Sequence, residues 1–144
     1  MKRKIYSLLT FLLTLAISVF SLVACDKEGS AKAEILSKTD TMVVIKVTEA
    51  KGLYPTLLCA MNYLKDQGEL TFEISGGMIS SIEGKENPLD YSSCWMLYTS
   101  DKETSNTEWG AIEYDGKTYD SAILGAESLP VSVGEYYILA YITF

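Results

Sequence analysis

The chain has 144 residues, a net charge of −7, 22% charged residues and no histidine. This length suits one globular domain after removal of a targeting segment, and it excludes two domains of ordinary size. The lack of histidine excludes Ser-His-Asp and Cys-His catalysis, histidine-ligated zinc and a histidine pH switch. The acidic charge, with no basic stripe after residue 4, argues against a nucleic-acid partner.

The first 25 residues have the pattern of a bacterial lipoprotein signal. Three basic residues at positions 2–4 precede an uncharged, mostly apolar run over residues 5–23. The run ends in Leu-Val-Ala-Cys at residues 22–25, which resembles the lipobox whose cysteine receives a diacylglycerol. We therefore predict cleavage after Ala24 and lipidation of Cys25, with palmitate-type acyl chains. An uncleaved transmembrane anchor and simple secretion are the alternatives.

The predicted lipidation implies three segments and a place in the cell. They are a signal peptide (residues 1–24), a lipidated tether (residues 25–32) and one folded domain (residues 33–144). Cleavage leaves 120 of the 144 residues and removes the three basic side chains near the start, which changes the charge from −7 to −10. We expect a protein anchored by lipid on the extracytoplasmic face of the cell membrane. Its acidic domain should stand off an anionic bilayer on its short tether.

The mature chain begins with a predicted β-hairpin. Strands are expected over Ala33–Lys38 and Thr41–Thr48, because apolar and polar residues alternate in both segments. In the second strand Val43, Ile45 and Val47 share one face. This face should pack against the core.

One helix is predicted after the hairpin. Thr56 is a suitable N-cap, and Gly68 is suitable for the residue just past the helix end. Between them Leu57, Met61 and Leu64 lie on one side of a helical wheel. This stripe should be buried against a sheet.

The rest of the chain is predicted to be strands and turns. Alternation continues through Leu70–Ser75, and Asp115-Gly116 between β-forming residues predicts a two-residue hairpin turn. Further strands are expected at Met78–Ile82, Cys94–Tyr98, Trp109–Tyr114, Lys117–Leu124 and Tyr136–Phe144, with a polar loop at Asp101–Thr107. The predicted fold class is α+β, a roll in which one mostly antiparallel sheet covers one helix.

Four segments together resemble a known family. They are Leu57-Leu58 at the start of the helix, GGMISSIEG at residues 76–84, CWMLY at residues 94–98, and Gly125 followed by LPVSVGE at residues 129–135. They resemble the transcobalamin-like C-terminal domain over residues 40–144. The resemblance implies a β-grasp-like roll, as found in cobalamin carriers and in bacterial surface lipoproteins. It also implies cobalamin as a possible ligand. In the carriers this module closes on a corrinoid held against a second, helical domain, so a single module would offer only one face to the ligand.

Three aromatic residues are the candidate ligand-binding residues. Tyr98 and Trp109 flank the polar loop, where exposed rings would stack on a flat ligand. Trp95 matches the aromatic strand of the family, and burial in the core is the competing interpretation for it. Most strand aromatics pack in the core or across strands, so the same alternative stands for all three.

The remaining cysteines are predicted to be unpaired. Cys59 falls on the side of the helical wheel opposite Met61, and so should face away from the sheet that contains Cys94. A disulfide requires Cα atoms within about 7 Å, which this placement disfavours. Two isolated cysteines without a CxxC motif also make no metal site.

No polar cluster predicts catalysis or a bound cofactor. Oxygen ligands in the polar loop could hold a cation only weakly, because their spacing matches no EF-hand. The other groups considered were an acidic pair on the hairpin and two adjacent serines without a histidine base. These residues are Asp101, Glu103 and Asn106 in the loop, Asp115 and Asp120 on the hairpin, and Ser92-Ser93. The favoured interpretation is a solvated loop for the first group and soluble surface for the hairpin acids, and the two serines are assigned no catalytic role.

The function predicted from the sequence is a lipid-anchored, extracytoplasmic binding or interaction module without catalysis. The first alternative, implied by the family resemblance, is a corrinoid-binding surface lipoprotein that passes its ligand to an importer. The second is a surface adhesion or structural domain that binds another protein through a sheet edge or an aromatic face.

Overall fold

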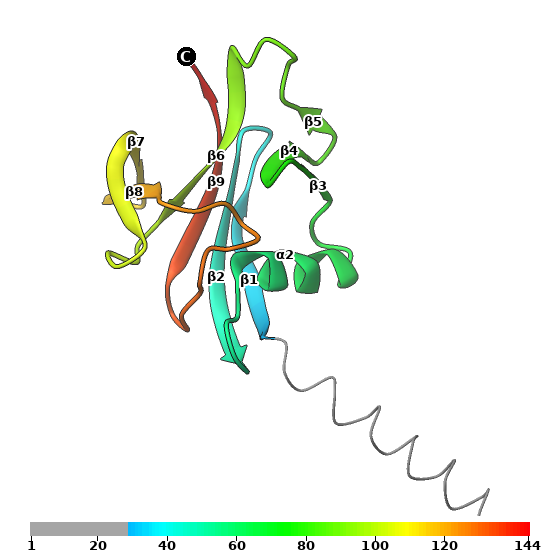
Figure 1. The fold of residues 1–144 in the computed structure, drawn as a ribbon, viewed down its shortest axis with the longest axis vertical. Helices are drawn as coiled ribbons and strands as arrows, with labels where there is room; N and C mark the ends of the chain where they lie inside the picture. Colours follow the sequence, from blue (N-terminus) through cyan, green and yellow to red (C-terminus); the bar gives the residue numbers. More distant parts are fainter. Residues whose placement is uncertain (1–28) are drawn as a thin grey trace, which may run out of the picture.

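The computed structural model describes residues 29–144, and within them it contains two antiparallel sheets and one helix (Figure 1). The larger sheet has the strand order β1-β2-β9-β6-β8-β7, and the smaller one has the order β3-β4-β5. The expected α+β class is therefore confirmed, with the sheets dominant. The elements are β1 (Ser30–Lys38), β2 (Met42–Lys51), α2 (Leu57–Asp66), β3 (Phe72–Ser75), β4 (Met78–Ile82), β5 (Lys85–Glu86), β6 (Ser93–Thr99), β7 (Ser105–Tyr114), β8 (Lys117–Ala122) and β9 (Tyr136–Thr143).

Strand β1 begins earlier than the sequence predicted. The predicted signal peptide and Cys25 lie outside the described residues, but the predicted tether over residues 25–32 is partly described. It is wrong for its last three residues, because β1 starts at Ser30. Ala31 and Ala33 are buried in the core beside α2. Alanine is too small to give a clear hydrophobic periodicity, so the start of the strand was missed.

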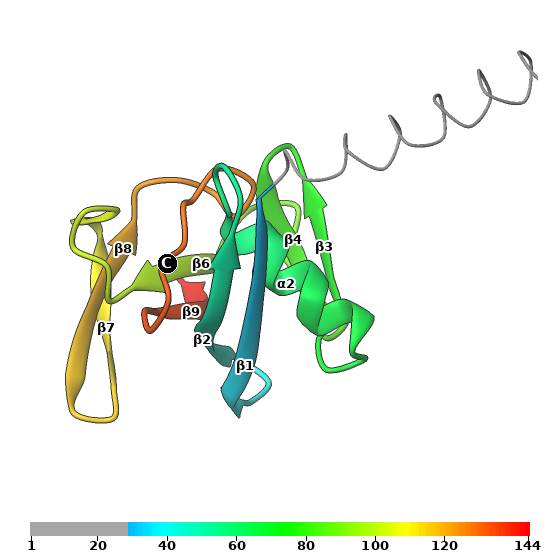
Figure 2. The same ribbon diagram turned by 90° about the horizontal axis from the view of Figure 1, so that it is seen from below.

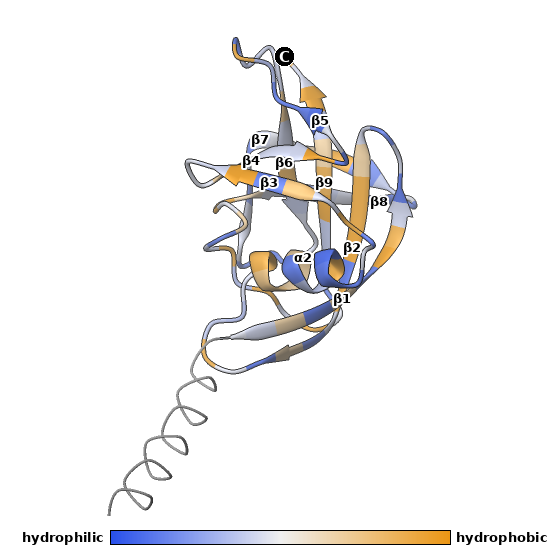
Figure 3. Ribbon diagram, turned by 90° about the vertical axis from the view of Figure 1, so that its right-hand side faces the viewer, coloured by the Kyte–Doolittle hydropathy of each residue, from blue (hydrophilic) through white to orange (hydrophobic). Residues whose placement is uncertain are grey.

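The centre of the larger sheet follows the predicted alternation. On β2, Val43, Ile45 and Val47 pack in the main core, whereas Val44 faces a second cluster on the other side of the sheet. Strand β9 alternates in the same way, with Tyr137, Leu139 and Tyr141 toward the main core and Ile138, Ala140 and Ile142 toward the second cluster. Both strands are coloured mostly as hydrophobic in Figure 3. Strands that are buried on both faces read as nearly continuous apolar runs.

The predicted helix is confirmed as α2, with its apolar stripe fully buried. Its end is a Schellman motif: the Glu69 N–H donates to the Leu64 carbonyl, and the N–H of Gly68, with φ of +74°, donates to Lys65. Thr56 makes no side-chain cap. The N–H groups of the first two helical residues donate instead to backbone carbonyls of Ala126 and Leu129. Among the described residues, no helix is long and apolar enough to cross a membrane.

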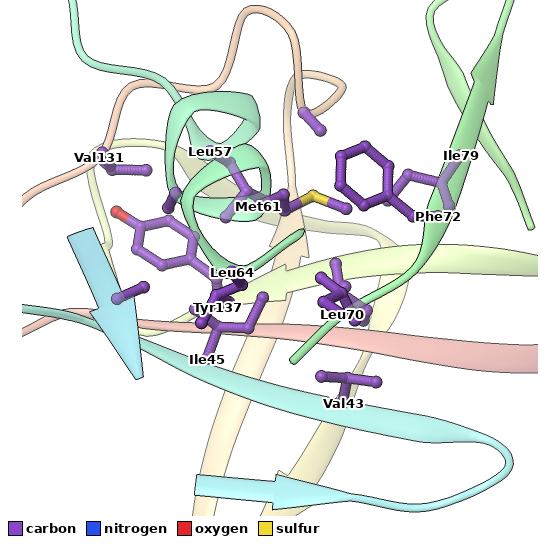
Figure 4. Packing of buried hydrophobic residues seen from close by; sticks show 14 of the residues in the cluster. Val43, Ile45, Leu57, Met61, Leu64, Leu70, Phe72, Ile79, Val131 and Tyr137 are labelled. Atoms are coloured by element: carbon purple, nitrogen blue, oxygen red, sulfur yellow. The ribbon is translucent and has the colours of Figure 1, made fainter. Parts of the chain in front are cut away.

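The prediction of a single sheet is wrong. Strands β3, β4 and β5 form a separate sheet, which lies with α2 on one side of the central strands, while β7 and β8 lie on the other side (Figure 2). Figure 4 shows the Met61 side chain pointing toward Phe72 of β3. The apolar side chains of the small sheet are thus buried in the same core as those of the helix. The small sheet joins the rest of the domain through this packing, and its strands form no hydrogen-bonded pairs with the larger sheet.

The β7–β8 hairpin confirms the predicted two-residue turn. Asp115 and Gly116 have φ of 48° and 71°, the left-handed conformations of a type I′ turn. Strand β7 starts at Ser105, so the predicted polar loop ends earlier than expected. The hairpin contributes Tyr119 to the second cluster, together with Tyr98 and Ile138. The face of the sheet opposite α2 is therefore partly covered.

Tyr137 should make stability depend on pH in the alkaline range. Burial raises the pKa of its phenol to about 12 from an ordinary value of 10, although the Ser132 N–H donates to the hydroxyl at 3.1 Å. The folded state disfavours the phenolate, so this stabilisation is complete below about pH 10 and is lost as the pH rises toward 12. We expect a loss of about 2–3 kcal/mol. Urea unfolding at about pH 9 and about pH 12 should show a smaller difference in Tyr137→Phe than in wild type. An unchanged difference would contradict the assignment.

Candidate functional site

An open, mostly apolar groove lies beside β6. Its volume is about 470 Å³, which is within the usual range for small-molecule sites. One wall is the β3–β4 turn and the other is the segment that leaves β8. The lining residues are Gly77, Met78, Ile79, Tyr91, Cys94, Trp95, Met96, Leu97, Trp109, Ala122, Ile123, Leu124, Gly125, Ala126 and Phe144. We call this site the β6 groove.

The groove lies beside β6 because that strand is only partly paired on one side. Strand β9 pairs with all of Ser93–Thr99, whereas β8 pairs only with Tyr98 and Thr99. The chain leaves β8 at Ala122 and then crosses to the β3–β4 turn. There Gly125 approaches so closely that an added Cβ would lie 2.6 Å from the Gly77 carbonyl oxygen. The lack of a side chain at residue 125 thus brings the two walls together.

Trp109 is exposed, as the sequence predicted, and it lines the groove together with two other exposed aromatic residues, Tyr91 and Phe144. Trp109 lies in a bulge of β7, since Asn106 and Ala111 pair with consecutive residues of β8 and four residues loop out between them. The buried Ser121 hydroxyl donates to the Asn106 carbonyl at 2.8 Å and accepts from the Trp109 N–H at 3.3 Å. Bulges commonly re-aim a side chain near a functional site. The indole is 62% exposed and lines the groove.

The predicted exposure of Tyr98 is wrong, and the structure does not place this residue on the groove. Its side chain is 3% exposed and packs in the second cluster, on the sheet face covered by the hairpin. Its hydroxyl lies 3.5 Å from the Trp109 carbonyl oxygen, at the limit of a hydrogen bond. Burial raises the pKa of the phenol, with a smaller contribution from Cys94. Tyr98 therefore supports the backbone beneath Trp109.

Trp95 combines the two predicted roles. Its indole is buried in the main core, and its Nε1–H donates to the Lys85 carbonyl at 2.8 Å. The ring meets Tyr141 edge-on, with centroids 5.3 Å apart. Its backbone N–H donates to the Asn87 side chain at 3.0 Å. Trp95 also lines the groove, so its buried, hydrogen-bonded ring forms a fixed part of the groove wall.

Within residues 29–144, Cys59 and Cys94 form no disulfide with each other. Cys94 is buried and lines the groove, and burial raises the pKa of its thiol, which keeps it protonated and weakly nucleophilic. Cys59 is half-buried, and its thiol lies 3.3 Å from the Gly29 carbonyl and 3.5 Å from the Thr56 hydroxyl. It therefore packs beside the start of β1 instead of pointing into solvent.

The oxygen ligands of the polar loop are used locally. Asp101 accepts the Glu103 N–H at 2.9 Å, and Asn106 accepts the Glu108 N–H at 3.1 Å. These are Asx turns, in which a side-chain oxygen takes the place of a backbone carbonyl. Across residues 29–144, no group of three or more His, Cys, Asp or Glu side chains is placed to hold a metal ion.

The other polar candidates are not brought together. The hairpin register places Asp120 opposite Ala111, away from the turn that contains Asp115, and Asp120 pairs with Lys102. The two carboxylates therefore do not form an acid–base pair. The Ser92 backbone N–H bonds to Asp90, and the Ser93 hydroxyl bonds to Thr143 at 3.2 Å.

Several groove residues were missed in the sequence. The pattern at Met78 and Ile79 predicts only a strand, and the pattern at Ile123 and Leu124 predicts only the end of a strand. Strand β8 ends at Ala122, which leaves Ile123 and Leu124 about half exposed. The available signal was a pair of large apolar residues directly before Gly125, where a chain leaving a strand would be expected to be polar.

Comparisons with known proteins give no relationship: no family model, no curated protein and no solved structure matches this chain.

Proposed function

We propose that the protein is a lipid-anchored extracytoplasmic binding module that holds an apolar ligand in the β6 groove and does no chemistry on it. The observation that carries this proposal is the groove itself, where an exposed indole lies above an apolar lining. Anchoring rests on the lipobox-like residues 22–25. A binding module held at the membrane is the function that both features support.

The lining favours binding over catalysis. Tyr91 and Cys94 are the titratable side chains among the lining residues, and no carboxylate or amine is among them. Burial holds the Cys94 thiol in its neutral form. The lining thus lacks the histidines, carboxylates and amines that most often serve as general acids and bases. Contact with apolar surface is what the lining provides, so the ligand should be apolar and should reach Trp109.

A corrinoid is the second candidate ligand. The family resemblance implies it, and the observation that favours it is the exposed Trp109 indole, because a flat conjugated ring can stack on an aromatic face. Ligand stacking at one open face buries less of a large ring than enclosure between two domains. We therefore expect a corrinoid to bind more weakly than a compact apolar molecule.

Substitution of Trp109 tests the proposal. The probe is 8-anilinonaphthalene-1-sulfonate, whose fluorescence rises in apolar sites, and cyanocobalamin is titrated separately by its visible spectrum. Trp109→Ala should raise the Kd of the dye by about 5- to 150-fold, which corresponds to about 1–3 kcal/mol for an aromatic hot spot. Because Trp109 is exposed, the fold should survive the change.

Tyr54→Ala is the matched control, because Tyr54 is an exposed aromatic residue that is not part of the groove lining. It should leave the Kd of the dye unchanged. Equal weakening in both variants, or none in Trp109→Ala, would refute the groove as the binding site. A spectral change of cyanocobalamin that requires Trp109 would identify the corrinoid as the better candidate.

A further inference from the structure

The end of the domain where β1 begins carries two large exposed apolar residues. Leu53 and Tyr54 lie between β2 and α2 and are 63% and 85% exposed. Gly29, the residue before β1, packs directly against them: a Cβ added to Gly29 would lie 2.5 Å from the Tyr54 carbonyl carbon and 2.4 Å from the Pro55 nitrogen. We call Gly29 and Leu53–Pro55 together the β1 pole.

The backbone presents Tyr54 outward. Tyr54 has φ of +65°, in the left-handed region that a tyrosine adopts only at a cost. The β2–β9 and α2 layers bury large apolar side chains nearby, yet this ring stays outside them. A strained, exposed aromatic residue is more readily explained by an external contact than by folding, since nothing in the described core gains from it.

The chain length places this pole beside the predicted lipid. Cys25 and Gly29 are four residues apart. A chain spans at most about 3.6 Å per residue, so Gly29 lies within about 14 Å of the lipidated residue. The interfacial region of a bilayer is a few ångströms thick on each side of the hydrocarbon. Because Gly29 is the described residue closest in the chain to Cys25, the β1 pole is the part of the described domain that the anchor holds nearest to this region.

The charges of the pole allow this approach. Lys32 and Lys51 pair with Glu49 at 3.2 and 3.1 Å, which leaves one net positive charge in this cluster. The mature chain as a whole is acidic, so an anionic bilayer should repel its other surfaces more than this one. Tyrosine is enriched at membrane interfaces, where its ring is buried and its hydroxyl stays hydrated.

We infer that the β1 pole touches the lipid surface, with Leu53 and Tyr54 inserted among the headgroups. This inference rests on the proposed lipid anchor at Cys25. The C-terminus lies at the opposite end of the domain from the start of β1 (Figure 1). Phe144 lines the β6 groove, so at least this part of the groove lies at the end of the domain far from the β1 pole. In this orientation the β1 pole contacts the membrane. The rest of the acidic domain stays away from it, because an anionic bilayer repels negative charge.

Tryptophan reporters at the two ends of the domain test this orientation. The full chain, produced in a bacterium that lipidates proteins, is reconstituted in vesicles of phosphatidylglycerol and brominated phosphatidylcholine. Bromine quenches an indole that enters the bilayer interface. Tyr54→Trp should lose fluorescence and shift its emission to shorter wavelength, relative to unbrominated vesicles. Leu53→Trp is a second reporter should the first variant fold poorly.

Two control proteins, wild type and Leu89→Trp, are measured in the same vesicles. Wild type reports only Trp95 and Trp109, at the groove, and should not be quenched. Leu89→Trp places an equally exposed indole in the loop before β6, since Leu89 is 99% exposed, and it should not be quenched either. Quenching of Leu89→Trp to the same extent as Tyr54→Trp would overturn the inferred orientation.

Vesicle flotation separates the inference from the proposed function on which it rests. If wild type does not float with the vesicles, or if the Cys25→Ser variant floats as well as wild type does, the proposed lipid anchor is refuted. The inferred membrane contact is then refuted with it. If wild type floats in a Cys25-dependent way but neither pole reporter is quenched, the anchor stands and the membrane contact of the β1 pole is refuted.

Discussion

Met61→Ala is expected to lower the free energy of unfolding by about 2–5 kcal/mol, the range for truncation of a large buried side chain to alanine. Met61 is fully buried on the inner face of α2, and its thioether points toward the Phe72 ring of the small sheet (Figure 4). Truncation removes a contact between the helix and β3 and leaves a cavity between the layers. Urea unfolding followed by circular dichroism measures the loss.

Two variants on the same helix serve as controls. Met61→Leu preserves most of the volume and should cost less than about 1.5 kcal/mol. Asn62→Ala changes an exposed neighbour and should stay within about 0.5 kcal/mol of wild type. A loss below about 0.5 kcal/mol in Met61→Ala would place the side chain on the surface and contradict the packing of α2 against β3.

Tyr98→Ala is expected to destabilise the fold by about 3–5 kcal/mol, as for other buried aromatic residues. The ring is the part of β6 that packs under the β7–β8 hairpin, beside Tyr119 and Ile138. Without it the hairpin loses its support, and the Trp109 backbone above it loses its neighbour. The change in unfolding free energy is measured by urea titration, and dye binding is measured on the folded protein below the transition.

Tyr98→Phe separates the ring from the hydroxyl. Because the hydroxyl makes only one long contact at 3.5 Å, its removal should cost less than about 1 kcal/mol and leave the dye affinity unchanged. A stable Tyr98→Ala protein with weakened dye binding would show instead that Tyr98 touches the ligand, as its position in the sequence predicted. Strong destabilisation with retained affinity in the folded fraction would confirm the buried role.

A buried serine, Ser121, holds the backbone of the exposed groove residue Trp109 in place. Ser121 is buried at the base of the β7 bulge, where its hydroxyl donates to the Asn106 carbonyl, just before the looped-out residues, and accepts from the Trp109 N–H within them. A buried polar group that is fully hydrogen-bonded fixes a local geometry, because the alternative leaves it unsatisfied. Trp109 thus projects from a rigid platform, which lowers the entropy cost of binding.

The sequence by itself determined the local elements of this protein. Alternation in β2 correctly predicted that Val43, Ile45 and Val47 share a face that packs in the core. The stripe of α2 and its terminal Gly68 predicted the helix, and Asp115-Gly116 predicted the hairpin turn. These features depend on backbone conformation and on neighbours within a few residues, so the pattern alone carries them.

Only the tertiary structure decided which elements pack against each other. An apolar face must be covered, but the pattern does not say by what: β3 to β5 cover α2 as a second sheet, and the β7–β8 hairpin covers the face where Tyr98 was expected to be free. The bulge that exposes Trp109 depends on a register between two strands, and the β6 groove depends on Gly125 meeting a turn 48 residues earlier in the chain. The burial of a side chain depends on contacts between segments that are distant in the chain. The apolar pattern of a single sequence predicts that a face is buried, but it does not predict which segment covers that face.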